Sequence, residues 1–451
     1  MTPKQIIFSP GRTLIFSALF VIFLGALLLL LPQAQKIPIS PIDCLFTSVS
    51  TACVTGVLSV PFESFTLFGK IIILLLMQIG GIGIITLTLS FISLFMDLGM
   101  ATQLMIGQVL ELDTWKKAQR FLFFIILFTV CIEALGSIII FFSINAQYTT
   151  GQALFHAIFH SVSSFCNVGL SSFGSNMYHF GESMLPYQHN LIMLCTTGLL
   201  ILLGGVGFLT WYELFFYVKA RLKGKRYNLS LTTKVVIIMT IALISTATLM
   251  LIALEGKRQF PHTSGLVMFF NMLFNAISYR STGLTTIDLN TMHLATVFMI
   301  IMYSFIGSSP GSTGSGIKVT TFALFLATTR AVITGRTVVD LKGRRIPQDQ
   351  VFKAMAVLAL SIGWIIISTF LLLLTERHTS FINLFFESVS SFTTLGLATS
   401  ITPTLSVPGK ILIMMSMFIG RIGSLTLLLA LRARHYERVE FQYPVERIMM
   451  S

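Results

Sequence analysis

Charged side chains are scarce in this chain of 451 residues, because Asp, Glu, Lys and Arg together make up only 10% of it. Hydrophobic residues make up 54%, and the mean hydropathy is +0.86. In soluble domains, about a quarter of the residues are charged. The composition therefore excludes a soluble protein and predicts that most of the chain lies in lipid.

Acidic residues are the scarcer charge, with 17 Asp and Glu against 30 Lys and Arg. A net charge of +13 could indicate a nucleic-acid partner, but the basic residues are confined to loops between apolar runs. That distribution is typical of membrane proteins, whose cytoplasmic loops are rich in Lys and Arg. Of the basic residues, 21 fall on one predicted side of the membrane and 6 on the other. The bias predicts that the chain is a multi-pass membrane protein with both termini in the cytoplasm.

Cysteines are few and odd in number, and their positions show neither metal-ligand spacing nor a disulfide framework: Cys44, Cys53, Cys131, Cys166 and Cys195. The sequence also lacks any Ser/His/Asp, Cys/His or paired-carboxylate constellation, so it indicates no enzyme. His156 and His160 have a spacing that can bind metal, but no third ligand accompanies them, and helix packing explains them better. We expect no bound cofactor.

Long apolar runs are abundant. Eight of them can cross a bilayer, near 13–31, 71–95, 120–143, 190–216, 235–254, 295–329, 354–374 and 411–431. The first could be read as a signal peptide, but it is long enough to span the bilayer, and each later unit carries an equivalent run. Between the members of each pair lies a shorter apolar segment, at 41–50, 153–163, 266–277 and 382–390. These segments are too short to span, so we predict re-entrant half-helices, or pore helices.

Each short segment ends in a hydroxyl-rich loop around one glycine, and the four glycines are spaced by 113, 114 and 113 residues: Gly56, Gly169, Gly283 and Gly396. A repeat this regular predicts an all-α membrane protein built of four pseudo-symmetric units around one central pore. Each unit is a helix, a pore helix, a loop and a second helix. The predicted units are 1–96, 97–218, 219–330 and 331–434, followed by a cytoplasmic tail at 435–451. Unit two contains an 11-residue insertion, which we place at 174–189.

The loops have the chemistry of an ion-selectivity filter. A potassium ion must shed most of its water in a narrow pore, and backbone carbonyl oxygens can replace that water. Glycine permits the backbone angles that turn carbonyls inward. No carboxylate lies within two residues of the glycines, so selectivity would depend on carbonyls. The predicted potassium-binding backbone is Val54, Thr55, Gly56, Asn167, Val168, Gly169, Ser281, Thr282, Gly283, Thr394, Leu395 and Gly396. The alternative, that the glycines only allow close helix contacts, does not require four matched positions.

Two features break the repeat. Unit three carries a Gly- and Ser-rich run with one proline at 307–318, where an unbroken helix is unfavourable. Such a break must face a pore or protein, so it is a candidate gate, although it could simply join two short helices. We expect the break in unit three alone.

Arg421 takes the place of Gly81 in the aligned fourth unit, and we expect it to contact the broken segment unless it extends to the cytoplasmic face. The predicted gate residues are Gly311, Ser312, Thr313, Gly314, Ser315, Gly316, Lys318 and Arg421.

These loops, spans and chain length resemble the membrane subunits of the Trk/Ktr/HKT superfamily of potassium transporters, and in particular the KtrB type. The single glycine per loop is the specific mark, and the resemblance covers the whole chain. It implies potassium uptake through a glycine filter, gating by an intramembrane loop, and potassium selectivity where Gly56 fills the first filter position. It also implies a homodimer on a cytoplasmic nucleotide-binding ring of the KtrA type.

Some assignments stay open at this point. A secondary transporter that couples potassium to sodium or protons is the alternative function, although four parallel units favour a pore over inverted halves. The basic loops could dock a regulatory subunit or bind anionic lipid. Glu133 could be an ion or proton site or a helix contact, and the direction in which Glu387 faces cannot be read from the sequence.

Overall fold

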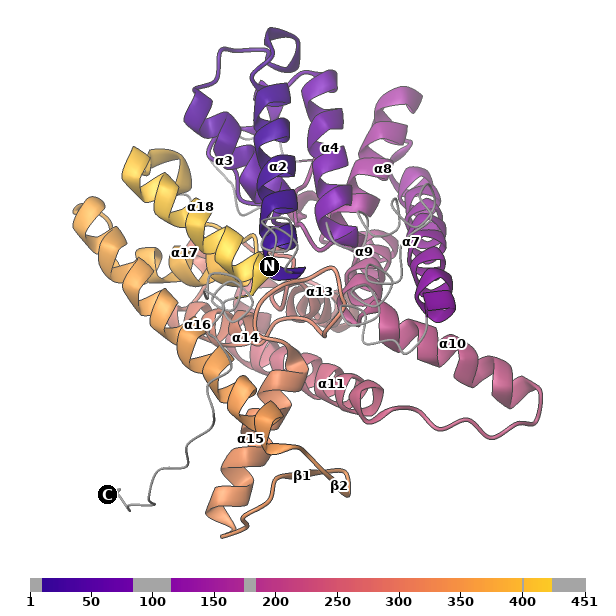
Figure 1. Cartoon of the computed structure of the whole chain (residues 1–451). Coiled ribbons are helices and arrows are strands. Elements are labelled where there is room, and N and C mark those ends of the chain that lie inside the picture. The colour runs from indigo at the N-terminus through magenta and orange to yellow at the C-terminus, as the bar shows by residue number, and fades with distance from the viewer. Residues whose placement is uncertain (1–9, 84–114, 174–183, 400, 424–451) are drawn as a thin grey trace, which may run out of the picture.

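The computed structural model describes residues 10–83, 115–173, 184–399 and 401–423, and its regular structure is almost entirely helical (Figure 1). Parts of the chain lie outside these ranges, including most of the predicted insertion at 174–189, the tail at 435–451 and the later parts of the predicted spans 71–95 and 411–431. Three described helices are long and apolar enough to cross a membrane, over 119–144, 231–259 and 348–375.

The helices follow the order that the hydrophobic runs predict. The helix before each short segment is α2 (Pro10–Leu29), α7 (Trp115–Ile144), α11 (Leu231–Leu251) or α16 (Gln348–Thr375). The short helices are α3 (Pro41–Ala52), α8 (Thr150–Phe165), α13 (Gly265–Ser278) and α17 (Phe381–Thr393). The helices after the glycine loops are α4 (Leu67–Ile82), α9 (Leu191–Gly205), α10 (Phe208–Leu222), α14 (Leu294–Phe305), α15 (Val319–Ile333) and α18 (Val407–Ile422).

Several short elements connect these helices. One-turn 3-10 helices are η1 (Pro32–Ala34), η2 (Phe62–Ser64), η3 (Leu185–Tyr187), η5 (Leu289–Thr291) and η6 (Thr402–Thr404). A π-helical turn, η4 (Ile252–Gly256), continues α11 into α12 (Lys257–Gln259). Among the described residues, the two strands form one hairpin, of β1 (Asp340–Leu341) and β2 (Arg344–Arg345). Lys342 and Gly343 form its two-residue turn, both with positive φ, as tight hairpins require.

The short helices begin where Ser or Thr stands at the N-cap position, namely at Ser40, Thr149, Ser264 and Ser380. The Ser40 and Ser264 side chains accept hydrogen bonds from backbone N–H groups of the first turn. The last five residues of each short helix are buried, which brings the four glycine loops into the interior.

Glycines set how closely the later helices pack against these ends. A Cβ atom on Gly80, Gly204 or Gly420 would lie 2.4, 1.9 or 1.8 Å from a carbonyl oxygen at the end of its own unit's short helix. The three carbonyls belong to Ala52, Phe165 and Phe392, which occupy matched positions in the repeat. Only glycine therefore fits at these crossings.

The prediction that only the third unit has a broken second helix is wrong. The predicted span 190–216 bends by 98° between α9 and α10, at a break of two residues that ends with Gly207. Gly207 has φ +94°, and Gly83 and Gly423, which follow α4 and α18, have φ +91° and +90°. Side chains avoid these angles, so a glycine at the same place marks the bend between α9 and α10 and the ends of α4 and α18.

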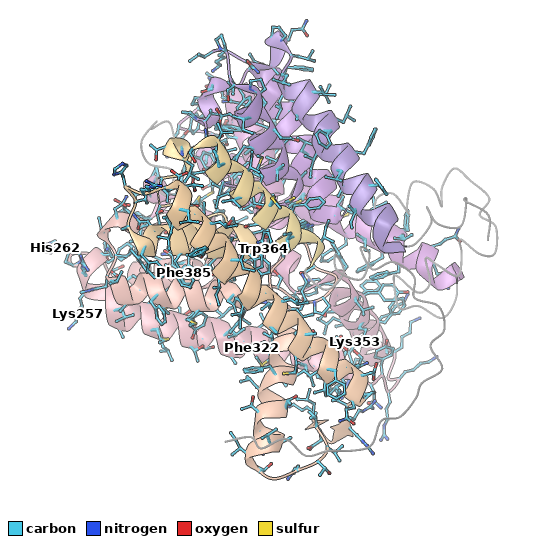
Figure 2. All side chains as sticks on the ribbon, turned by 60° about the vertical axis from the view of Figure 1, so that its left-hand side comes forward. Lys257, His262, Phe322, Lys353, Trp364 and Phe385 are labelled. Atoms are coloured by element: carbon cyan, nitrogen blue, oxygen red, sulfur yellow. The ribbon has the colours of Figure 1, made fainter. Side chains whose placement is uncertain are left out.

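The distribution of side chains is inverted relative to a soluble protein. Large apolar side chains are exposed along α2, α7 and α16, for example Phe20, Phe123 and Phe370. Hydroxyl and amide side chains are instead buried around the ends of the short helices. An exposed apolar surface of this extent requires a nonaqueous environment, so the outer faces lie in lipid. Figure 2 labels Trp364 of α16 and Phe385 of α17, which are partly buried and pack against the core beneath the exposed side chains.

The first and last parts of the chain meet. Helix α18 packs against α3, and the Lys410 ammonium forms an ion pair with the Asp43 carboxylate at 2.7 Å, where both side chains are largely buried. Figure 1 shows α18 beside α3 although 366 residues separate Ala52 from Phe418 in the sequence. This contact closes the arrangement of helices into a ring.

Candidate functional site

The four loop glycines share one backbone conformation, in the left-handed region that favours glycine. Their φ values are +83° for Gly56, +83° for Gly169, +74° for Gly283 and +88° for Gly396. Two residues before the glycine, Val54, Asn167 and Thr394 also have positive φ. Non-glycine residues adopt that conformation at a cost, and only where the surrounding structure holds them in it.

A matched backbone hydrogen bond holds three of the loops. The N–H group before the glycine donates to a serine carbonyl five residues earlier, in the pairs Thr55–Ser50 at 2.7 Å, Val168–Ser163 at 2.9 Å and Leu395–Ser390 at 2.9 Å. In the third loop, the N–H groups of Thr282 and Gly283 both donate to the Ser278 carbonyl. The loops are therefore similar, with a local change in the third.

The loops contact one another in cyclic order. A Cβ atom on Gly56 would lie 1.8 Å from the Val168 carbonyl oxygen, and one on Gly169 would lie 1.7 Å from that of Thr282. A Cβ atom on Gly283 would lie 2.3 Å from the Leu395 carbonyl oxygen, and one on Gly396 would lie 2.5 Å from the Thr55 carbonyl oxygen. Each glycine thus packs against the carbonyl that precedes the glycine of the next loop, and the fourth returns to the first.

The carbonyl oxygens of the ring also approach a common region. Besides the Thr55 oxygen, a Cβ atom on Gly396 would meet the Thr282 oxygen at 2.9 Å and the Val168 oxygen at 3.1 Å. Carbonyl dipoles packed side by side repel one another unless a cation or water lies among them. The arrangement is therefore suited to a dehydrated cation.

Several buried hydroxyls near the ring have no hydrogen-bond partner within the described part of the protein. They are Ser50 Oγ, Thr55 Oγ1, Ser163 Oγ, Ser278 Oγ and Thr394 Oγ1. Buried polar atoms usually have partners, supplied by protein or by water. Their concentration at the ends of the short helices indicates that this region is hydrated.

Asn167 connects the ring to the broken segment. Its Oδ1 atom accepts from Ser281 Oγ at 3.0 Å and Thr282 Oγ1 at 2.6 Å, while its Nδ2 donates to Thr313 Oγ1 at 2.6 Å. The Thr313 hydroxyl in turn donates to the Phe165 carbonyl at the end of α8. One fully buried amide therefore holds the second loop, the third loop and the segment 307–318 together.

The segment between α14 and α15 also forms backbone hydrogen bonds with the bent helix pair α9 and α10. Backbone N–H groups of Ser309 and Thr313 donate to the carbonyls of Gly205 and Gly204, both at 3.2 Å. In return, the Phe208 N–H at the start of α10 donates to the Gly311 carbonyl at 2.9 Å. The free backbone groups at both helix breaks satisfy one another, as burial in the membrane requires.

Arg421 lies against the same segment. Its guanidinium donates to the Thr313 carbonyl at 2.5 Å, to Ser315 Oγ at 3.0 Å and to the Gly80 carbonyl at the end of α4. The bidentate fork of an arginine suits such a cluster of acceptors. This one side chain therefore bridges α18, α4 and the segment.

The other predicted gate residues occupy different environments. Gly311 is exposed with open space around its Cα, whereas Gly314 is buried against Ser308. Ser312 Oγ donates to the Ser309 carbonyl at 2.6 Å, and Lys318 Nζ donates to the Gly314 carbonyl at 2.8 Å. Gly316 has φ +76° where the segment turns towards α15.

Two carboxylates left open by the sequence lie in contacts outside the ring. Glu133 on α7 accepts a hydrogen bond from Gln78 Nε2 on α4 at 3.0 Å. Glu387 on α17 accepts from the Thr399 N–H at 3.1 Å and Thr402 Oγ1 at 3.0 Å, so it holds the chain just beyond Gly396. His156 and His160 hydrogen-bond to separate hydroxyls, those of Ser172 and Thr197.

The sequence reasoning missed two contributors to the site. Arg280 is buried, and its Nε donates to the Gly307 carbonyl at the start of the broken segment, at 3.3 Å. The signal was present, because the aligned positions hold Cys53, Cys166 and Thr393 and only unit three has a charge there. Gly207 was already visible as the last glycine of a motif shared by units one, two and four.

Comparisons with known proteins agree with this geometry. A family model described as "TrkH: Cation transport protein" matches residues 12–440. Two proteins of Bacillus subtilis, Ktr system potassium uptake proteins B and D, are 31% and 33% identical over 449 residues. Those alignments cover 98% of this chain and 96% and 97% of the relatives.

A further relative is the potassium/sodium uptake protein NtpJ of Enterococcus hirae, 28% identical over 98% of this chain and 97% of its own length. The crystal structure of the potassium transporter TrkH from Vibrio parahaemolyticus superposes with a TM-score of 0.71 at 20% identity, covering 94% of this chain and 86% of that one. At that identity, the superposition supports the fold. The protein is a multi-pass membrane transporter rather than an enzyme, and it belongs to the TrkH family of cation transport proteins.

Proposed function

We propose that the protein takes up potassium by passive permeation through a selectivity filter formed by the four glycine loops. The observation that carries this proposal is the cyclic packing of Gly56, Gly169, Gly283 and Gly396 against the carbonyls of Val168, Thr282, Leu395 and Thr55. Carbonyl oxygens replace the hydration shell of potassium, and glycine permits the backbone that presents them. Potassium as the ion is supported by the relatives that align over nearly the whole chain, which are named as potassium uptake proteins.

The four units at 1–96, 97–218, 219–330 and 331–434 are the architecture that this function implies. Their support is the matched glycine spacing, the equivalent short helices and the ion pair between Lys410 and Asp43 that joins the fourth unit to the first. In this proposal the filter residues are the backbone of 54–56, 167–169, 281–283 and 394–396.

The segment 311–318 and Arg421 are proposed as the gate. The segment lies against Asn167 of the second loop and is held by the Arg421 guanidinium through the Thr313 carbonyl and Ser315 hydroxyl. Its many glycines and its open position at Gly311 allow a change of backbone conformation at low cost. Opening would require these hydrogen bonds to exchange for water.

We also propose a homodimer that works with a cytoplasmic nucleotide-binding subunit of the KtrA type, with both termini on the cytoplasmic side of the plasma membrane. The relatives are named as proteins B and D of a "Ktr system", which implies more than one component. The basic residues at 219–234 and 330–353 offer surfaces on the predicted cytoplasmic side.

Cation flux in liposomes tests the filter. We expect wild-type protein to pass potassium in preference to sodium and Gly56→Ser to lose much of that preference, because its side chain must displace the Val168 carbonyl 1.8 Å away. Gly151→Ser is the matched control, since Gly151 on α8 has nothing within 4 Å. Equal discrimination in wild type and Gly56→Ser would refute the filter assignment.

Coupled transport is a second candidate, and the name of the NtpJ relative, which includes sodium, favours testing it. The same liposomes distinguish the two functions. Potassium entry that persists with sodium absent from both sides supports passive permeation. Potassium entry that requires a sodium or proton gradient supports coupling.

A further inference from the structure

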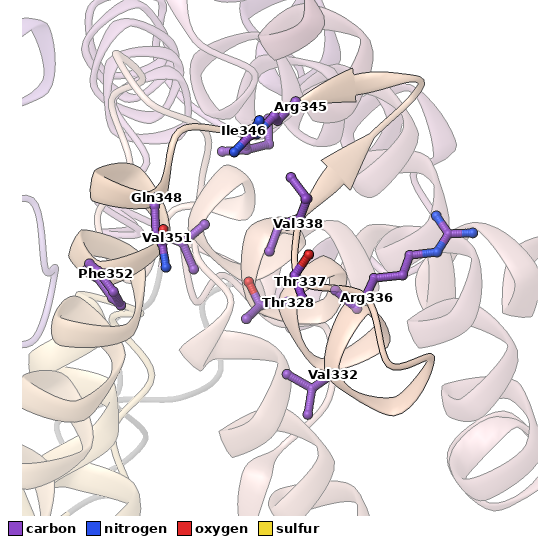
Figure 3. A pocket seen from close by; sticks show the side chains of 12 residues that line it. Thr328, Val332, Arg336, Thr337, Val338, Arg345, Ile346, Gln348, Val351 and Phe352 are labelled. Atoms are coloured by element: carbon purple, nitrogen blue, oxygen red, sulfur yellow. The ribbon is translucent and has the colours of Figure 1, made fainter. Parts of the chain in front are cut away.

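A cavity of about 220 Å³ lies between the end of α15, the β1–β2 hairpin and the start of α16 (Figure 3). Its lining includes two basic residues, Arg336 and Arg345, and the apolar residues Val332, Val351 and Phe352. The cavity is far from the glycine loops in the fold, because the hairpin projects at the opposite end of the molecule from α3 (Figure 1). The proposed filter and gate do not use it, although the proposed docking of a cytoplasmic subunit draws on basic residues of the same stretch, 330–353.

The charge around this cavity is strongly positive. The stretch 330–353 contains six basic and two acidic residues. Both acidic residues already have a basic partner one turn away, in the exposed pairs Arg336–Asp340 at 3.2 Å and Lys353–Asp349 at 3.4 Å. Within the described part of the chain, Arg345 has no such ion pair, so an anion at the cavity would meet uncompensated charge.

Two apolar residues of the lining are exposed. Val332 is 73% exposed and Phe352 is 64% exposed, and Ile333 beside them is 79% exposed. Phe352 lies in the first two turns of α16, which is one of the helices long enough to span the membrane. The cavity therefore lies beside the N-terminal end of a helix long enough to span the membrane, with apolar groups next to basic groups. Such a combination suits the level of lipid headgroups.

We propose that this cavity binds the phosphate headgroup of an anionic phospholipid from the cytoplasmic leaflet. Arg345 contacts the phosphate directly, and Arg336 joins it by exchanging its exposed partner Asp340, a pair that contributes little in water. The acyl chains lie along Val332 and Phe352. Basic pockets at the cytoplasmic ends of membrane helices are suited to such headgroups.

The dimensions favour a lipid over a larger occupant. Pockets that enclose a whole small molecule have volumes of about 300–1,000 Å³, which exceeds this cavity. A docked protein would need a matching surface to cover Val332 and Phe352, whereas flexible acyl chains need none, and Phe352 belongs to a helix long enough to span the membrane. Phosphate free in solution shares the charge but has no group to cover Val332 and Phe352.

The test is retention of lipid by purified protein. Wild-type protein is reconstituted in vesicles of phosphatidylcholine with phosphatidylglycerol, extracted in detergent and examined by native mass spectrometry. We expect retained phosphatidylglycerol, and about 30-fold weaker binding in the double variant Arg336→Gln with Arg345→Gln, since each basic group near the headgroup contributes about fivefold. Lys225→Gln with Arg226→Gln removes the same charge from the other exposed basic loop and is expected to retain the lipid.

A second variant guards against loss by misfolding. Asp340→Asn releases Arg336 from its ion pair and is expected to tighten phosphatidylglycerol binding. Inorganic phosphate added during extraction is expected not to displace the lipid; displacement at equal concentration would assign the site to free phosphate. Equal lipid retention in the double variant and wild type would overturn the proposal and leave the arginines to a protein partner. Equal loss of phosphatidylglycerol in the Lys225→Gln and Arg226→Gln control would also overturn the proposal, because it would show that lipid binding depends on total charge and not on this cavity.

Discussion

Asn167 is the residue through which the glycine loops and the broken segment depend on each other. Its buried amide makes four hydrogen bonds, three of them to other segments, and the matched positions Val54, Ser281 and Thr394 have no equivalent amide. A buried donor or acceptor that loses its partner costs about 1–3 kcal/mol. Separation of the second loop from Thr313 is therefore energetically unfavourable unless water replaces the lost hydrogen bonds.

This network predicts coupled effects on potassium flux. Asn167→Ala and Thr313→Val each remove one end of the 2.6 Å hydrogen bond, so each is expected to raise basal flux. The double variant is expected to add little more, with a coupling energy of at least about 0.5 kcal/mol. Potassium flux in liposomes at equal protein content measures this coupling energy, and Asn290→Ala, at an exposed residue, is the control. Fully additive effects would show that the two side chains act independently.

At the scale of elements, the breaks in the helices join the proposed filter loops to the proposed gate segment. The bend at Gly207 opens the end of α9, and its free carbonyls accept N–H groups from the segment between α14 and α15. Arg421 on α18 donates further hydrogen bonds to the same segment. The segment is thus held by three helices, and a change in any of them reaches it.

Removal of Arg421 is expected to loosen this segment. Arg421→Ala loses hydrogen bonds to the Thr313 carbonyl and the Ser315 hydroxyl, and hydrogen bonds to charged groups contribute about 1.5–3 kcal/mol each. Potassium flux at equal expression is expected to rise about tenfold. Arg421→Lys is expected to be intermediate, because an ammonium cannot make the same bidentate contacts. Arg377→Ala, at an exposed arginine, is the control, and unchanged flux in Arg421→Ala would contradict the gate.

The sequence was sufficient for the elements that depend on local pattern. Hydrophobic runs located the spans and the short helices, because apolar length decides what crosses a bilayer. The exchange of Gly81 for Arg421 was enough to expect a contact with 307–318, since a buried guanidinium needs acceptors. The 98° bend at Gly207 was missed, because an apolar run around a glycine motif looks continuous until packing against 309–313 is known. The side-chain contacts of Asn167 and Arg280 depend on distant segments and have no local pattern.

At the scale of the whole molecule, the inverted distribution of side chains fixes the environment, and the basic loops set the orientation. The exposed loop around Lys225 is expected on the cytoplasmic side, and Lys36 is expected outside. Lys36→Cys in intact cells is therefore expected to react with a membrane-impermeant maleimide. Lys225→Cys is expected to react only after permeabilisation, and the unsubstituted chain is the background control. The reverse pattern would invert the topology.

The central claim is that four carbonyl oxygens, from Thr55, Val168, Thr282 and Leu395, together bind a dehydrated potassium ion. Anomalous diffraction from crystals grown in rubidium, which substitutes for potassium, locates such an ion directly. We expect an anomalous peak inside the ring of glycine loops, in contact with these four oxygens. A ring without an anomalous peak in crystals that bind rubidium elsewhere in the protein would contradict the account.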